Sequence, residues 1–393
     1  MLLSIALIIF LSLSLAKLFS FIKLPSIIGI LISGIILGPF VLNLIDPTIL
    51  EVSADLRQIA LIVILVRAGL SLDLSDLRKV GRPAFFLSFI PATIEMVVIT
   101  LLAPLFFQIT YIEAAILGAV VAAVSPAVVV PRMIKLMQSG HGKEKRIPHL
   151  VLASASIDDV FVIIIFMSLI QTYQSDNFSM FSILSIPIAI ILGVSIGILT
   201  GYTLTKYFKK FHIRDTVKVL IIFAVSFLLV TLDDAIRDIV PFSGLIGVIS
   251  MGMTILFLYE LLAKRLVLKF EKIWVISEIM LFVLVGAALE LSVLRDVGLY
   301  GILLILIALG FRLCGVFIAL IKTRLTWKEK LFVGFSYMPK ATVQAAIGTI
   351  PLALGMPSGH LILSIAVLAI VITAPIGSIL IDNSSSKLLL KTN

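Results

Sequence analysis

Most of this sequence consists of apolar runs of about twenty residues, and this feature limits most strongly how the chain can fold. A helix needs about 20 apolar residues to cross the hydrocarbon core of a bilayer. Apolar residues make up 61% of the chain and charged residues only 13%, so a water-soluble core could not bury this surface. The sequence therefore predicts an all-α polytopic membrane protein.

The apolar runs predict about thirteen transmembrane helices in one membrane domain that covers residues 1–393. Their approximate bounds are residues 2–22, 24–43, 56–73, 82–107, 112–137, 148–172, 180–206, 216–232, 241–262, 272–295, 298–322, 328–354 and 360–382. The first run lacks the charged start of a signal peptide and continues into a second apolar run, so we predict a true helix there. Since the chain ends about ten residues after the last predicted helix, we expect no soluble regulatory domain in it.

The net charge of +9 reflects topology, because most of the 31 Lys and Arg fall in alternate loops and in the C-terminal tail. Cytoplasmic loops of membrane proteins carry such an excess of basic residues. We therefore expect a multi-pass protein of the inner or plasma membrane, with its N-terminus outside and its C-terminus in the cytoplasm. We expect membrane lipid and no nucleic acid as its partner.

An internal repeat divides the chain. Residues 72–81, LDLSDLRKVG, recur as LELSVLRDVG at residues 289–298, an offset of 217. At one residue more, Ile28-Gly29 and Gly34 match Ile246-Gly247 and Gly252. Predicted helices 2 to 6 then correspond to helices 9 to 13, and an odd displacement gives the copies opposite orientations. Such inverted-topology repeats are typical of secondary transporters. Their expected bounds are about 2–172 for repeat one, 180–206 for a linker helix and 216–382 for repeat two.

Four ionisable residues lie near the middle of predicted helices: Glu95, Asp158, Asp159 and Arg312. A charge at the bilayer centre costs several kcal/mol unless it is paired or hydrated. The repeat offset relates Glu95 to Arg312, so we predict that these two form a buried ion pair. The alternative is that each charge reaches water or the lipid headgroups alone.

Two equivalent helices carry breaks, at Ser125-Pro126 in repeat one and at Pro339-Lys340 in repeat two, with Pro131 and Pro351 further along. Proline removes a backbone donor and bends or ends a helix. The recurrence predicts two crossed discontinuous helices rather than simple kinks. Lys340 would then offset the negative C-terminal ends of the half-helices.

Three motifs carry a family resemblance: residues 154–159 (SASIDD), residues 124–131 (VSPAVVVP) and residues 339–348 (PKATVQAAIG). With them the chain resembles the paired-aspartate branch of the monovalent cation/proton antiporters, and most closely the NHA-type sodium/proton antiporters. The resemblance implies a mobile core domain, a dimerisation domain and a homodimer, with an ion site at Asp158 and Asp159 and a Glu95–Arg312 pair. Many of these relatives have Lys at the position of Arg312, paired with the first aspartate, so the partner of Asp158 and the proton stoichiometry stay open.

The paired aspartates also indicate exchange chemistry on their own. Desolvation and mutual repulsion disfavour two ionised carboxylates side by side, so Na⁺, Li⁺ or protons compete to neutralise them. Ser125 and Ser154 are candidate hydroxyl ligands, although serines in membrane helices more often bond a carbonyl one turn back. We expect exchange of Na⁺ or Li⁺ for H⁺ by alternating access, with no cofactor and no enzymatic activity.

Several other functions remain open at this point. A K⁺/H⁺ antiporter or K⁺ efflux unit and a sodium-coupled organic-anion symporter share this architecture. Asp233-Asp234 with Asp238 has the spacing of an acidic motif that could hold Mg²⁺ in a membrane-bound prenyl transferase. That motif has no second copy, however, and is explained more simply as a solvated cap between helices.

Overall fold

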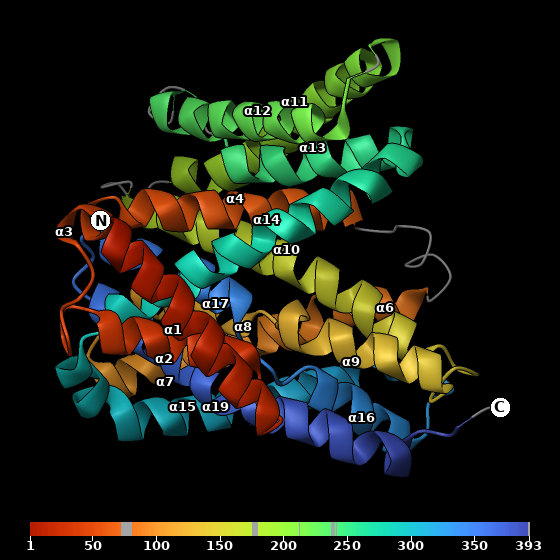
Figure 1. Cartoon of the computed structure of the whole chain (residues 1–393). Helices are drawn as coiled ribbons and strands as arrows, with labels where there is room; N and C mark the ends of the chain where they lie inside the picture. Colours follow the sequence, from red (N-terminus) through yellow and green to blue (C-terminus); the bar gives the residue numbers. More distant parts are fainter. Residues whose placement is uncertain (72–80, 175–179, 212, 237–239, 241, 392–393) are drawn as a thin grey trace. The chain divides into compact units, whose positions relative to one another are not determined.

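The computed structural model describes residues 1–71, 81–174, 180–211, 213–236, 240 and 242–391 (Figure 1). Within these residues the secondary-structure elements are all helices and there is no β-strand, which confirms the predicted all-α membrane class. The first copy of the repeated motif, at residues 72–80, lies outside the described residues, as does Asp238.

The helices follow the apolar runs closely. They are α1 (Leu2–Phe21), α2 (Ser26–Leu37), α3 (Pro47–Glu51), α4 (Ser53–Ser71), α6 (Arg82–Leu87), α7 (Ile90–Phe107), α8 (Tyr111–Ala122), α9 (Pro126–Ser139), α10 (Ile147–Gln174), α11 (Met180–Lys210), α12 (Asp215–Ile236), α13 (Gly244–Leu258), α14 (Glu260–Ala287), α15 (Leu291–Ala319), α16 (Trp327–Ser336), α17 (Thr342–Ile347), α18 (Ile350–Ala353) and α19 (Gly359–Leu388). Eight stretches of the described residues are long and apolar enough to cross a membrane, and three shorter apolar helices accompany them.

The predicted helix bounds were wrong in one region. The apolar run predicted a helix at 272–295, but α14 begins at Glu260 and ends at Ala287, and α15 begins at Leu291. Helix α14 begins earlier than hydropathy predicts because charged residues also favour helix formation. Lys264 Nζ, for example, donates to Oε1 of Glu260 one turn before it, at 2.5 Å. Hydropathy therefore locates the apolar span of a helix, whereas backbone hydrogen bonds decide where the helix ends.

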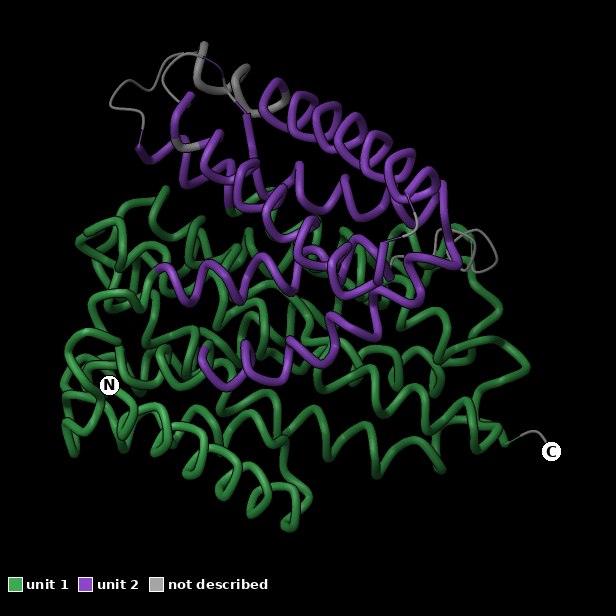
Figure 2. Tube along the Cα trace, turned by 45° about the horizontal axis from the view of Figure 1, so that its top comes forward, with its two compact units in different colours: residues 1–54, 73–166, 281–393 green, residues 55–72, 167–280 purple. Residues whose placement is uncertain are grey.

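The chain forms two compact units, coloured separately in Figure 2. Unit 1 contains residues 1–54, 73–166 and 281–393, and unit 2 contains residues 55–72 and 167–280. All the intramembrane residues singled out above, from Glu95 to Lys340, belong to unit 1. The proposed bounds of the two repeats stay a prediction.

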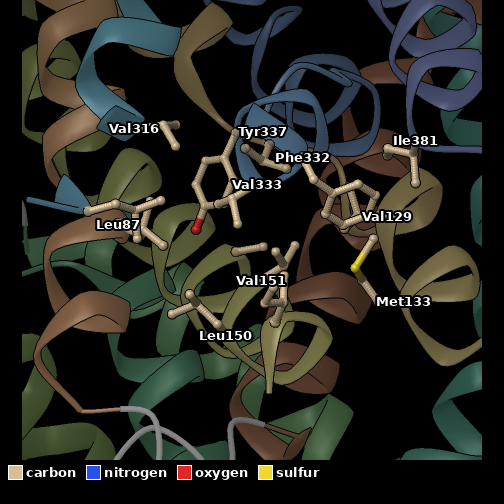
Figure 3. Packing of buried hydrophobic residues seen from close by; sticks show 14 of the residues in the cluster. Leu87, Val129, Met133, Leu150, Val151, Val316, Phe332, Val333, Tyr337 and Ile381 are labelled. Atoms are coloured by element: carbon tan, nitrogen blue, oxygen red, sulfur yellow. The ribbon is translucent and has the colours of Figure 1, made fainter. Parts of the chain in front are cut away.

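Unit 1 has a core that joins the half-helices to α10. Buried side chains of α6, α9, α10, α15, α16 and α19 meet in one cluster, part of which is drawn in Figure 3. The cluster includes Leu87, Val129, Met133, Leu150, Val151, Val316, Phe332, Val333, Tyr337 and Ile381. Because α9, α10 and α16 share this core, the two helix breaks are held beside the helix that carries Asp158.

Unit 2 is built around close backbone contact between α11 and α13. A Cβ added at Gly197 would clash with the carbonyl of Gly247 and lie 2.7 Å from Cβ of Ser250. Only glycine lets the two helices approach this closely, as is common in membrane helix packing.

Candidate functional site

The two predicted helix breaks are both present. In the first, α8 ends at Ala122 and α9 begins at Pro126; in the second, α16 ends at Ser336 and α17 begins at Thr342. Pro126 occupies the first turn of α9, where a missing N–H costs nothing. The breaks meet directly, since the N–H of Ser125 donates to the carbonyl of Pro339 at 2.8 Å. Unwound backbone at membrane depth is thus covered by protein, as it must be.

The second proline of this stretch does not extend the first break. Helix α9 continues through Pro131 to Ser139. Pro131 is the sixth residue of α9, so its missing N–H removes only one of the first hydrogen bonds of the half-helix. The break therefore ends at Pro126, where α9 begins.

Helix α19 supports the second break. A Cβ on Gly377 would clash with the ring of Pro339, lying 2.8 Å from its Cδ, so only glycine admits the proline here. The N–H of Lys340, freed by the break, donates to Oγ1 of Thr373 at 2.9 Å. The extended backbone around Pro339 is thus shaped by its neighbour α19.

The C-terminal end of α8 receives side-chain donors from α15, from α17 and from the second break. Lys340 Nζ donates to the carbonyl of Ala122 at 3.1 Å, and Arg312 Nη1 donates to the same oxygen. Gln344 Nε2 donates to the carbonyls of Ala123 at 2.8 Å and Val121 at 3.2 Å. Cations and amide donors at this position offset the negative end of the helix dipole, which is the role expected for Lys340.

Gln344 was not singled out from the sequence. It is completely buried, and its Oε1 also accepts from the N–H of Ala341 at 2.8 Å. The available signal was a polar side chain inside an otherwise apolar stretch of the 339–348 motif. A buried amide with all its contacts on backbone groups indicates a residue that fixes the crossing.

The structure brings Glu95 and Arg312 into contact. Arg312 Nη1 lies 2.5 Å from Glu95 Oε2, and neither side chain is more than 1% exposed. Lys340 Nζ lies 2.7 Å from the same carboxylate oxygen. Glu95 therefore forms ion pairs with two cations. For Lys340 the sequence predicted only an interaction with the helix ends.

The adjacent aspartates have different surroundings. Asp158 is fully buried; its Oδ2 accepts from the N–H of Val124 at 2.9 Å and lies 3.3 Å from Arg312 Nη2. Arg312 is thus the partner of Asp158 that the sequence left open. Asp159 is 8% exposed, and its Oδ1 has no hydrogen-bond partner among the residues that the structure describes.

The two candidate serines also differ. Ser125 Oγ is buried and has no hydrogen-bond partner in the described part of the chain. Ser154 Oγ donates to the carbonyl of Leu150 at 2.6 Å, one turn back, and accepts from the hydroxyl of Tyr337. Ser125 is therefore open to a ligand, whereas Ser154 is engaged within the protein.

The site as a whole has an imbalance of charge. Three acids (Glu95, Asp158 and Asp159) face two bases (Arg312 and Lys340), so the fully ionised cluster carries one net negative charge. A buried uncompensated charge is strongly disfavoured. One bound monovalent cation or one proton neutralises the cluster.

The acidic motif considered for Mg²⁺ has a different role. Asp233 Oδ2 accepts from the N–H of Gly244, the first residue of α13, at 2.9 Å. It therefore caps a helix end, as the simpler interpretation of the motif predicts.

Comparisons with known proteins point to one family. The family described as "Sodium/hydrogen exchanger, transmembrane" matches residues 6–382. The chain is 34% identical over 399 residues to sodium/hydrogen exchanger 9B2 of Homo sapiens, covering 96% of this chain and 72% of that protein. It is 33% identical over 385 residues to sodium/hydrogen exchanger 9B1 of Macaca fascicularis, covering 93% and 73%.

A solved structure supports the fold. The sodium proton antiporter MjNhaP1 from Methanocaldococcus jannaschii at pH 8 superposes with a TM-score of 0.82 and 22% sequence identity, covering 98% of this chain and 97% of that one. At this level of identity the likeness concerns the architecture.

Proposed function

The chain belongs to the sodium/hydrogen exchanger family, and from that premise we propose that it exchanges Na⁺ or Li⁺ for H⁺ by alternating access, with Asp158 and Asp159 as the ion site. The observation that carries this proposal is the buried cluster with one net negative charge, in which Asp159 Oδ1 lacks a protein partner. Either a monovalent cation or a proton satisfies that charge, but not both together.

In this proposal Asp159 is the residue that binds the alkali cation and the proton in turn. Its free carboxylate oxygen and the hydroxyl of Ser125 are hard oxygen donors of the kind that alkali cations prefer. Protonation of Asp159 removes the charge that holds the cation, so binding of one ion releases the other. Exposure of the site to each face in turn then couples the two gradients.

Asp158 has a supporting part in the same cycle. The Val124 N–H and Arg312 hold its carboxylate, and its charge adds to that of Asp159 next to it. Loss of that charge weakens cation binding without removing the exchanging oxygen. We therefore expect Asp158 to affect sodium affinity and Asp159 to be essential for exchange.

The proposal also covers the membrane location, the orientation and the oligomeric state of the protein. The protein is a multi-pass membrane protein of an exchanger family. We propose a homodimer in the inner or plasma membrane, with the N-terminus outside and the C-terminus in the cytoplasm. The ion gradients supply the energy, so transport needs no cofactor and no catalytic reaction by this chain.

The test is ion exchange by purified protein in proteoliposomes, with Na⁺, Li⁺ and K⁺ supplied separately. Asp159→Asn should reduce exchange to the level of empty liposomes while the protein still inserts and purifies as a folded species. Asp382→Asn, which changes an aspartate in a half-exposed ion pair with Arg132, is the matched control and should exchange normally. Near-normal Na⁺ exchange by Asp159→Asn would refute the site, and exchange of K⁺ alone would favour the K⁺/H⁺ alternative.

A further inference from the structure

Tyr337 lies at the end of the half-helix α16, where the second break begins. Its side chain is completely buried in the core of unit 1, and Figure 3 shows its ring with Val316 and Val333 nearby. A buried tyrosine usually places its hydroxyl on a specific partner, since an unpaired hydroxyl is costly. Tyr337 has two sets of contacts near the ion site, one with Arg312 and one with α10.

On one side Tyr337 holds Arg312. Its carbonyl, exposed by the end of α16, accepts from Arg312 Nε at 2.8 Å. The guanidinium carbon also lies 5.6 Å from the centre of the tyrosine ring, within the range of a cation–π contact. These contacts fix the plane of the guanidinium group, so that Nη1 faces Glu95 and Nη2 faces Asp158.

On the other side Tyr337 holds α10. Its hydroxyl donates to Oγ of Ser154, which lies four residues before Asp158 and therefore on the same face of the helix. The carbonyl of Ser154 in turn accepts from Oγ of Ser88 at 3.3 Å. This turn of α10 is thus tied to α16 by a hydrogen bond that spans 183 residues of sequence.

We propose that Tyr337 is a positioning residue that sets how strongly Arg312 acts on Asp158, and thereby how Na⁺ and protons compete at the paired aspartates. The inference rests on the proposed ion site. The Asp158–Arg312 contact is long, at 3.3 to 3.4 Å, so small movements of either partner change its strength. Tyr337 contacts Arg312 directly and is bonded to Ser154 in the turn of α10 before Asp158, so it influences the separation of the two partners.

The direction of the effect follows from charge. Tyr337→Phe keeps the ring and the carbonyl but removes the hydroxyl that ties α10 to α16. The turn that carries Asp158 then moves more freely relative to Arg312, and the positive field at the carboxylate weakens. A weaker positive field makes the carboxylate pair attract protons and Na⁺ more strongly, but Na⁺ also needs several oxygens held in place whereas a proton needs one, so the looser turn favours protons. More Na⁺ and a higher pH are then needed to reach the same rate.

The experiment measures exchange by Tyr337→Phe, Ser154→Ala and the double variant over a range of Na⁺ concentrations and pH. Each single substitution should raise the apparent KM for Na⁺ about 3- to 10-fold, as expected for the loss of one buried hydrogen bond. The pH–activity profile should move toward alkaline pH by about 0.5 to 1 unit. The maximal rate should change less than KM, and the double variant should resemble either single one.

The matched control is Ser226→Ala in α12. Ser226 is also fully buried and donates to a carbonyl one turn back, that of Ile222, at 2.8 Å. It should leave KM and the pH profile unchanged. Tyr337→Phe that lowers thermal stability but leaves both readouts unchanged would overturn the positioning role, and so would independent, additive effects of the two substitutions. Normal exchange by Asp159→Asn would instead refute the ion site itself.

Discussion

The two helix breaks use the same backbone device but differ in length and in charge. The first leaves residues 123–125 outside a helix, and the second leaves residues 337–341. At the shorter break the N–H of Val124 donates to Asp158, and the carbonyl of Ala122, the last residue of α8, accepts from Lys340. The longer break supplies Lys340 itself, together with carbonyls that hold Arg312 and Ser125. The two breaks are therefore alike in backbone and different in chemistry.

Charge is divided in the same way between the two predicted repeats. With the offset of 217, Glu95 corresponds to Arg312, while Asp158 and Asp159 correspond to Pro375 and Ile376. The acids of the buried cluster thus lie before residue 160 and its bases after residue 311. Either part alone would bury like charges, so the cluster needs both.

The largest expected effect comes from removing one acid of the buried cluster. Glu95→Gln leaves Arg312 and Lys340 without their shared carboxylate, which should destabilise the protein by about 3–5 kcal/mol. The measurement is thermal unfolding in detergent at a fixed sodium concentration, because bound ion stabilises the native state. A substitution that left the melting temperature unchanged would show that the cluster is not held by its acids.

A double-mutant cycle separates the pair from its surroundings. Arg312→Gln alone leaves Glu95 and Asp158 without this cation, whereas the double variant with Glu95→Gln removes both charges of the pair. The double variant should be more stable than the sum of the single losses indicates, by about 1 kcal/mol or more. Strictly additive losses would mean that the repeat-related contact contributes nothing.

An intermediate effect tests the packing of the longer break. Gly377→Ala places a methyl group against Pro339 and should cost about 1–3 kcal/mol, since neither backbone can move without disturbing the crossing. Gly310→Ala in α15 is the control, because a Cβ there meets no heavy atom within 4 Å and alanine favours helix. Thermal unfolding should therefore shift in opposite directions for the two variants. Equal shifts would show that Gly377 is not needed for the proline to fit.

The smallest expected effect concerns a charge pair outside the crossing. Arg132, on the half-helix of the first break, lies 3.3 Å from Asp382, whose side chain is 49% exposed. Asp382→Asn should change stability by less than about 1 kcal/mol, because water screens an exposed pair. A loss as large as that of Glu95→Gln would remove the distinction between buried and exposed charges on which the comparison rests.

The predicted repeat led directly to one contact at the site. Glu95 and Arg312 lie 217 residues apart in sequence and form an ion pair, as the prediction of two inverted copies requires of positions near a symmetry axis. The breaks at Pro126 and Pro339 could also be predicted from the sequence, because proline acts locally on the backbone. By contrast, the Lys340–Glu95 pair and the tie from Tyr337 to Ser154 follow from no periodicity in the chain.

The sequence by itself determined the membrane class, the approximate spans, the breaks and the acids of the site, because hydropathy, proline chemistry and buried charge act over one helix or one repeat. Only the tertiary structure decided which donor serves which acceptor. Gln344 and Tyr337 acquire their roles from carbonyls freed at the breaks and from side chains on other helices. Such partners are chosen by the packing of whole helices, since a buried polar group bonds to whatever the fold brings within reach.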